Sequence, residues 1–206
     1  MRVVVAGGHG QIGFRLLRLL AERGDEAVGL IRNPAHADEL RAASVEPLVC
    51  DLEAADDVAL EADAVVFAAG AGPGSGAERK WTMDYGGAAK LMRAGVRRYV
   101  IVSAMGAADP PAEGGDVFGE YLRAKAKADQ ELAASGLDYT IVRPGRLTDD
   151  PPTGRVRAAE RLQRGEIPRA DVAATLAALL DEPATIGRAF DLVSGDTPIG
   201  EAIKQV

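Results

Sequence analysis

Short apolar runs alternate along the whole chain with longer segments in which apolar positions recur every three or four residues. This alternation is typical of βαβ units and predicts a mainly parallel sheet with helices on both faces. The expected strands are Arg2–Ala6, Glu26–Ile31, Val45–Cys50, Ala64–Ala68, Arg98–Val102, Tyr139–Val142 and Ala189–Val193. The expected helices are Ile12–Arg23, Pro34–Ala43, Ala77–Ala94, Phe118–Ser135 and Asp171–Leu180, the last N-capped by Asp171.

The predicted fold is a single α/β Rossmann domain over residues 1–206, doubly wound, with about seven strands in the order 3-2-1-4-5-6 and a seventh near Phe190. Segments 107–116 and 148–154 break the rhythm because they are rich in Pro, Gly and Asp. Both follow expected strands and therefore emerge at the carboxyl edge of the sheet, where open α/β folds bind ligands. We expect a small substrate cap from the loops near 106–118 and 147–168.

A glycine-rich turn joins the first strand to the first helix. Gly7, Gly10 and Gly13 give the spacing Gly-x-x-Gly-x-x-Gly, a variant of the dinucleotide-binding pattern, with Gln11 and Ile12 between the last two glycines. Such glycines allow a tight turn, close approach of a pyrophosphate and close packing of the new helix, whose N-terminus then faces the phosphates. The alternative is a glycine turn without a ligand.

Three further strand ends bear on the cofactor. Arg32 ends the second strand where an acid would hold the ribose 2′-hydroxyl of NAD, so we expect NADP(H) to be preferred over NAD(H); the alternative is a solvated arginine. Asp51 and Leu52 close the third strand, where Asp51 accepts from an adenine amino group or simply caps a turn. The small residues that end the fourth strand permit close approach of the ribose, although they also suit an ordinary turn: Ala68, Ala69 and Gly70.

Tyr121 and Lys125 are four residues apart in an expected helix, so their side chains share one face. A lysine ammonium beside a phenol is expected to lower the tyrosine pKa and to make Tyr121 a general acid and base for a carbonyl–alcohol pair. Ser103 directly follows the fifth strand and is placed to hydrogen-bond the same substrate oxygen.

With these residues assembled, the chain resembles the short-chain dehydrogenase/reductase superfamily, and most of all its compact, atypical NAD(P)H-binding members related to epimerases and dehydratases. The resemblance spans nearly the whole chain. It implies that Tyr121 acts as acid and base, that Lys125 binds the nicotinamide ribose and that Ser103 polarises the substrate. It also places Pro144 and Gly145 at the turn beside the nicotinamide. An Asn-Asn-Ala-Gly element is replaced here by residues 68–70, and the short C-terminal region argues against a nucleotide-sugar substrate.

The composition of the chain limits the classes of partner that we expect it to bind. The net charge of −7, from 31 acidic and 24 basic residues, argues against sequence-independent nucleic-acid binding. No apolar run approaches the roughly 18 residues of a membrane span, and the single cysteine, Cys50, fits a reducing compartment, so we expect a cytoplasmic protein. His9 lies in the phosphate loop with its side chain expected to face solvent, and His36 has no Cys, His or acid at ligand spacing, so no metal site is expected.

The sequence therefore predicts an NADP(H)-dependent oxidoreductase that acts on a small carbonyl, alcohol or conjugated acceptor, as a monomer or homodimer. The alternative from another class is a protein that binds NADP(H) and senses it or recruits a partner without turnover, because a dinucleotide loop serves either role.

Overall fold

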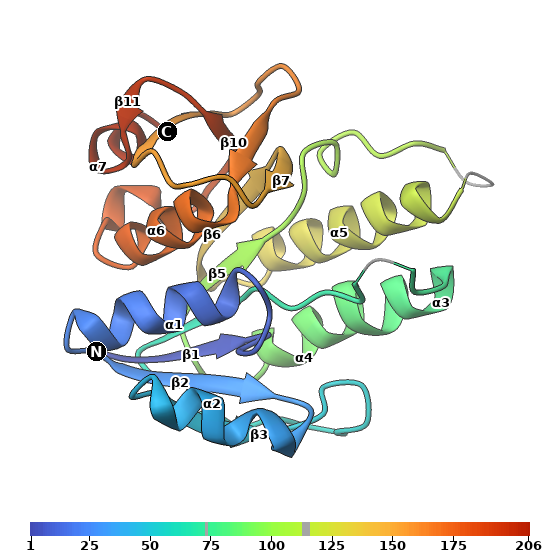
Figure 1. Cartoon of the computed structure of the whole chain (residues 1–206). Coiled ribbons are helices and arrows are strands. Elements are labelled where there is room, and N and C mark those ends of the chain that lie inside the picture. Colours follow the sequence, from blue (N-terminus) through green and yellow to red (C-terminus); the bar gives the residue numbers. More distant parts are fainter. Residues whose placement is uncertain (73, 113–115) are drawn as a thin grey trace.

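The computed structural model describes residues 1–72, 74–112 and 116–206 (Figure 1). Within these residues a nine-stranded sheet runs in the order β11-β8-β10-β6-β5-β4-β1-β2-β3, and β7 and β9 pair separately. The strands are β1 Arg2–Ala6, β2 Glu26–Ile31, β3 Glu46–Val49, β4 Ala64–Phe67, β5 Arg98–Val102, β6 Asp138–Pro144, β7 Arg146–Thr148, β8 Arg155–Ala159, β9 Glu166–Pro168, β10 Arg188–Ser194 and β11 Thr197–Pro198.

The predicted fold class is confirmed, because β1 to β6 and β10 form parallel pairs in the expected order β3-β2-β1-β4-β5-β6-β10. The expected count of about seven strands is too low. The additional strands β8 and β11 extend the sheet beyond β10 in antiparallel orientation. These strands, like β7 and β9, come mainly from the segment predicted as cap loops. Each has two to five residues and is bounded by Pro or Gly, so its periodicity is too short to detect.

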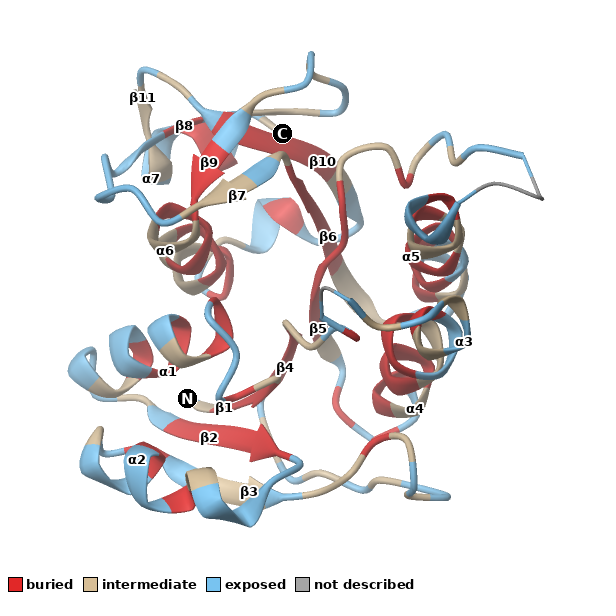
Figure 2. Cartoon of the chain, turned by 45° about the vertical axis from the view of Figure 1, so that its right-hand side comes forward, coloured by how far each residue is buried: buried red, intermediate tan, exposed pale blue. Residues whose placement is uncertain are grey.

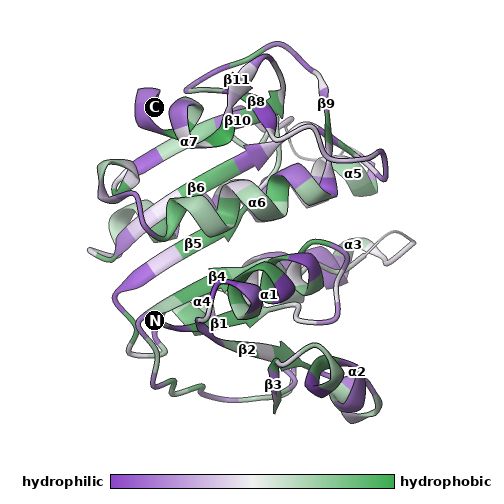
Figure 3. Ribbon diagram, turned by 60° about the vertical axis from the view of Figure 1, so that its left-hand side comes forward, coloured by the Kyte–Doolittle hydropathy of each residue, from purple (hydrophilic) through white to green (hydrophobic). Residues whose placement is uncertain are grey.

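Helices cover both faces of the sheet. They are α1 Gly13–Glu22, η1 Pro34–His36, α2 Ala37–Ala42, α3 Ala77–Arg79, η2 Lys80–Gly87, α4 Ala88–Met92, α5 Val117–Ala134, α6 Arg169–Leu179, η3 Pro183–Thr185, α7 Ile199–Ala202 and η4 Ile203–Gln205. One buried apolar cluster joins the sheet to α1, α2 and α6, and the other joins it to η2, α4 and α5. Hydrophobic residues accordingly follow β1, β4 and β5 in Figure 3, and β6 and β10 are buried for most of their length in Figure 2.

The helix predicted over 77–94 forms, but its middle, η2, is a π-helix of eight residues. Gly86 and Gly87 close this segment. A Cβ on Gly87 would lie 3.2 Å from Met83 Sδ and 3.6 Å from the Phe67 ring, so this glycine lets η2 pack closely against β4. Helix α4 continues the α-helical spacing from Ala88. π-Helical turns are rare, and they frequently occur at functional sites.

The prediction that Asp171 caps α6 is wrong. The helix begins at Arg169 with Pro168 in the cap position, and Asp171 is fully buried in the first turn. Its carboxylate instead accepts hydrogen bonds from the Thr153 N–H at 2.9 Å, the Thr153 hydroxyl at 3.0 Å and the Gly154 N–H at 2.9 Å. Asp171 therefore anchors the segment that follows β7 to the start of α6.

Of the loops predicted to form the cap, residues 113–115 lie outside the described residues. The second loop region contains β7, β8 and β9 and lies next to β10. No helix in the described part of the chain is long and apolar enough to cross a membrane.

Candidate functional site

The glycine-rich turn between β1 and α1 leaves no room for a Cβ at Gly7, Gly10 or Gly13. A Cβ on Gly7, where φ is +80°, would lie 2.9 Å from the Ala68 carbonyl oxygen, and one on Gly10 would lie 2.9 Å from Gly7 O. A Cβ on Gly13 would overlap the same Gly7 oxygen. The Gly10 N–H donates to Gly7 O at 2.7 Å, which closes the turn. The three glycines are thus required by the fold of the turn itself.

The N-terminus of α1 is open to an anion. Ile12 provides no side-chain cap, and the first turn contains no acidic residue. Among the described residues, the backbone N–H groups of Gln11 and Ile12 have no hydrogen-bond acceptor. Free N–H groups and the positive end of the helix dipole suit a pyrophosphate, so the turn fits the phosphates of a dinucleotide.

At the end of β2, the Arg32 side chain is about half exposed and its Nη1 lies 3.3 Å from Glu53 Oε2. Asp51 Oδ1 accepts the Glu53 N–H at 2.9 Å, so in this structure Asp51 stabilises a turn, and its contact with adenine stays a prediction. Leu52 is buried in the apolar cluster beside β4. Its carbonyl oxygen accepts from Lys90 Nζ at 2.7 Å. An acid therefore does reach Arg32, from the turn after β3 rather than from the end of β2.

The small residues after β4 lie where the chain passes the glycine turn. The Ala68 N–H donates to Ala6 O at 3.0 Å, and a Cβ on Gly7 would meet Ala68 and Ala69. A Cβ on Gly70 would lie 3.0 Å from Asp84 Oδ1. The smallness of residues 68–70 thus lets this loop lie between the glycine turn and η2.

Tyr121 and Lys125 lie together on α5, as predicted, with Lys125 Nζ 5.9 Å from the centroid of the Tyr121 ring. A second ammonium, Lys80 Nζ of η2, lies 5.7 Å from the same centroid. Lys125 Nζ also donates to Val102 O at 3.0 Å and pairs with Asp84 Oδ1 at 3.3 Å. The phenol ring therefore has two lysines beside it rather than one.

The titration of these groups differs from expectation. Burial raises the pKa of Tyr121 above its ordinary value, and the charge of Lys125 offsets this only in part, so the expected lowering is wrong. Burial alone would lower the pKa of Lys125, but Asp84 and Tyr121 outweigh burial and raise that pKa. At neutral pH the pair therefore consists of a neutral phenol and a charged ammonium.

Ser103 is buried at the end of β5, and its Oγ has no hydrogen-bond partner among the described residues. It lies next to Asp129, one turn beyond Lys125 on α5. The Asp129 carboxylate accepts from Arg143 Nε at 2.9 Å through Oδ2, whereas Oδ1 has no partner. Burial raises the pKa of Asp129, while Arg143 opposes that shift. The structure brings Ser103 to Asp129 and does not place it in a hydrogen bond with Tyr121.

Pro144 and Gly145 end β6 at the same edge of the sheet. Pro144 O accepts the Met105 N–H at 3.0 Å, and the Gly145 N–H donates to Leu192 O at 2.9 Å. A Cβ on Gly145 would overlap Gly165 O, so this glycine lets the chain pass close to residue 165. Their contact with nicotinamide stays a prediction.

A cavity of about 450 Å³ lies in the region predicted as the cap, and Tyr121 is not part of its lining. The lining residues are Thr148, Asp150, Pro151, Thr153, Arg157, Gln163, Arg164, Gly165, Glu166, Ile167, Pro168, Val193 and Ser194. Its volume is in the range of small-molecule sites. Within the described residues, no group of three His, Cys, Asp or Glu side chains is placed to hold a metal ion.

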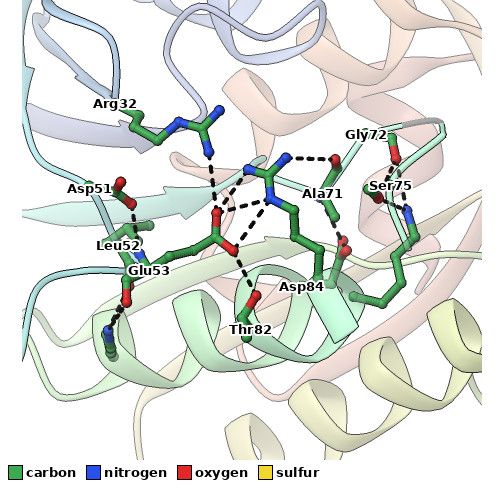
Figure 4. Close-up of polar contacts among 12 residues, drawn as sticks. Arg32, Asp51, Leu52, Glu53, Ala71, Gly72, Ser75, Thr82 and Asp84 are labelled. Atoms are coloured by element: carbon green, nitrogen blue, oxygen red, sulfur yellow. Dashed lines mark hydrogen bonds and ion pairs between the residues drawn. The ribbon is translucent and has the colours of Figure 1, made fainter. Parts of the chain in front are cut away.

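Sequence reasoning missed the residues that surround the predicted ones. Asp84 and Lys80 of η2 reach the Tyr121–Lys125 pair, and Arg79 joins Arg32 at Glu53 (Figure 4). Lys80 Nζ is anchored by Gly72 O and Ser75 Oγ, both at 2.8 Å. Four charged residues within residues 78–84 were the available signal, but they do not reveal which side chains turn inward.

Comparison with known proteins agrees with this geometry. The model of an NAD(P)H-binding family matches residues 7–183. A Bacillus subtilis protein named an uncharacterized sugar epimerase, YhfK, is 41% identical over 215 residues, with both chains covered completely. A solved Bacillus halodurans structure described as an NAD-dependent epimerase/dehydratase is 38% identical, covers both chains completely and gives a TM-score of 0.91.

A third relative carries a reductase name. The structure of ChuY from Escherichia coli O157:H7, called an anaerobilin reductase, is 25% identical with a TM-score of 0.77, covering 95% of this chain and 98% of that one. The chain is thus an NAD(P)-binding protein similar to short-chain dehydrogenases, with epimerase/dehydratase-like relatives. It belongs to the NAD(P)H-binding family whose model it matches.

Proposed function

We propose that this protein is an NADP(H)-dependent oxidoreductase that interconverts a small carbonyl compound and its alcohol, with Tyr121 moving the proton. The observation that carries the proposal is the Tyr121 ring with two ammonium groups beside it, Lys125 Nζ at 5.9 Å and Lys80 Nζ at 5.7 Å from its centroid. The NAD(P)H-binding family and a relative named a reductase support the same class of reaction.

In the direction of reduction, a bound nicotinamide supplies the hydride to the substrate carbon. The Tyr121 hydroxyl donates its proton to the substrate oxygen. Its raised pKa keeps the phenol protonated beforehand, and the charge of Lys125 stabilises the phenolate that is left. In the reverse direction the phenolate accepts the alcohol proton.

The position of Lys125 is fixed by groups outside α5. Asp84 and Val102 O hold its ammonium on the sheet side of the helix. This placement supports Lys125 and Tyr121 as the proton-handling pair. It supports Ser103 less strongly as the group that holds the substrate oxygen, because Ser103 Oγ is buried next to Asp129.

The proposed preference for NADP(H) rests on two arginines near the end of β2, where we expect the adenosine end of the cofactor. Arg32 follows β2, and Arg79 reaches the same carboxylate from α3. Guanidinium groups bind phosphate through planar, paired donors, which suits a ribose 2′-phosphate.

The test is NADPH consumption against a panel of aldehydes, ketones, quinones and flavins, with Tyr121→Phe and a matched Tyr139→Phe control. Tyr139 lies at the opposite end of β6 from Pro144. We expect Tyr121→Phe to lower turnover by about 100-fold or more with NADPH affinity within about threefold, and Tyr139→Phe to change neither.

Two other outcomes would refute the proposed mechanism. An unchanged rate in Tyr121→Phe would indicate hydride transfer without a protein-held proton, as expected for flavins or quinones. Absence of turnover across the panel, with NADPH-dependent association with a partner, would instead make the protein a non-catalytic NADP(H) sensor.

A further inference from the structure

Two arginines from different elements converge on one carboxylate at the adenosine end of the proposed cofactor site (Figure 4). Arg79 Nη2 of α3 lies 2.8 Å from Glu53 Oε2, and Arg79 Nε lies 3.1 Å from the same oxygen. Arg32 Nη1, at the end of β2, lies 3.3 Å from it. Glu53 therefore bridges two cations that are separated by 47 positions in the sequence.

The position of Glu53 is defined by further contacts. Its N–H donates to Asp51 Oδ1 at 2.9 Å, and its Oε1 accepts the Thr82 hydroxyl at 2.6 Å. Lys90 Nζ holds the preceding carbonyl, Leu52 O, at 2.7 Å. The hydrogen bond with Arg79 lowers the pKa of Glu53 against the effect of burial, so the side chain is a carboxylate at neutral pH. This is a built arrangement rather than a chance surface ion pair.

The donors that hold this carboxylate are the donors that a phosphate monoester requires. Two guanidinium groups and a hydroxyl converge from three elements, and planar guanidinium groups bind carboxylate and phosphate in the same way. The adjacent residues Asp51 and Leu52 are ones that the sequence predicts at the cofactor, Asp51 as an acceptor for the adenine amino group. A ribose 2′-phosphate in this place would meet Arg32 and Arg79, but it would also meet the negative charge of Glu53.

We propose that Glu53 sets the dinucleotide selectivity: its carboxylate is an internal counter-ion at the ribose 2′-phosphate site, and Arg79 is the second arginine of that site. The inference rests on the proposed NADP(H) site. Binding of a 2′-phosphate requires Glu53 to leave the arginines, which weakens NADP(H) binding. A ribose with a free 2′-hydroxyl leaves Glu53 in place as an acceptor, as acidic residues act in NAD sites.

The experiment uses calorimetric titration of the full chain with adenosine 2′,5′-bisphosphate and with 5′-AMP, which differ only in the 2′-phosphate. We expect Glu53→Gln to bind the bisphosphate about tenfold more tightly, equivalent to about 1.4 kcal/mol, with 5′-AMP unchanged within about threefold. The control is Glu46→Gln. This substitution removes the same charge, but Glu46 begins β3, at the other end of that strand from Glu53, and pairs with Arg2. The Glu46→Gln variant should therefore change neither affinity.

Arg79→Gln tests the second half of the proposal. It should weaken the bisphosphate about tenfold and leave 5′-AMP within about threefold. Glu53→Asp keeps the negative charge. Because the charge sets the selectivity in this proposal, this variant should bind the bisphosphate with nearly the wild-type affinity. Far-ultraviolet circular dichroism confirms that each variant is folded.

The outcomes separate this inference from the proposed function. Binding of both nucleotides with a ratio that Glu53→Gln leaves unchanged would overturn the role of Glu53 and leave the dinucleotide site intact. Failure of NADPH and NADH to bind the wild-type protein would overturn the proposed function and this inference with it.

Discussion

Replacing Lys125 by Met tests whether the buried ion pair beneath Tyr121 is a structural requirement as well as a chemical one. Lys125 is 3% exposed and Asp84 is 1% exposed, with their charged atoms 3.3 Å apart. Methionine replaces the apolar part of the lysine side chain but leaves Asp84 buried without a cation. Removing one partner of a buried pair costs about 3–5 kcal/mol. That is a large part of the free energy of unfolding of a domain, about 5–15 kcal/mol.

Urea denaturation measures this loss. With a slope of about 3 kcal/mol per M, the unfolding midpoint should fall by about 1–1.7 M. Asp84→Asn keeps an oxygen for the Ala71 N–H, which donates to Asp84 Oδ2 at 3.2 Å, so the double variant should recover at least about 1 kcal/mol of the summed loss.

The contribution of Lys125 to the free energy of unfolding depends on pH in one direction. Because the pKa of Lys125 is raised in the folded state, its contribution to stability is fully present below about pH 10.4, the unfolded value. It is lost as the pH rises through the folded pKa. A loss below about 1 kcal/mol in Lys125→Met, or strict additivity in the double variant, would refute this reasoning.

Two further predictions concern the phenol and the anchored segment. Because burial raises the pKa of Tyr121, kcat for carbonyl reduction should be constant between about pH 6 and 8. The rate of alcohol oxidation should instead increase with pH and not level off below about pH 10. An oxidation rate that is already constant at pH 7 would contradict the role of Tyr121. Asp171→Ala removes three hydrogen bonds to residues 153 and 154, so it should cost about 2–4 kcal/mol and open the exposed Arg155 to trypsin; wild-type resistance to trypsin at that residue would show that Asp171 does not anchor the segment.

Local patterns predicted much of this fold. The strands that are buried on both faces are continuous apolar runs, and the glycine turn marks the first βα connection, so the order of the parallel strands followed from chain connectivity. The antiparallel strands β8 and β11 could not be predicted, because each is short and gains its order from pairing with β10 or β8.

Some residues of the candidate site could likewise be predicted from local spacing, whereas others could not. Tyr121 and Lys125 lie within one helix, and their spacing alone places them on one face. Their partner Asp84 and the second lysine, Lys80, come from a distant segment, and their inward orientation depends on the π-helical spacing of η2. Sequence periodicity assumes 3.6 residues per turn and therefore misplaces the side chains of such a segment.

The π-helix also makes this part of the protein sensitive to chain length. Arg79 and Lys80 precede or begin η2, whereas α4 continues with regular spacing after it. Deleting one residue inside η2 would restore α-helical spacing and turn the preceding residues by about 100° around the helix axis. Arg79 would leave Glu53 and Lys80 would leave Tyr121 together, although neither was substituted. The length of η2 therefore controls both contacts at once.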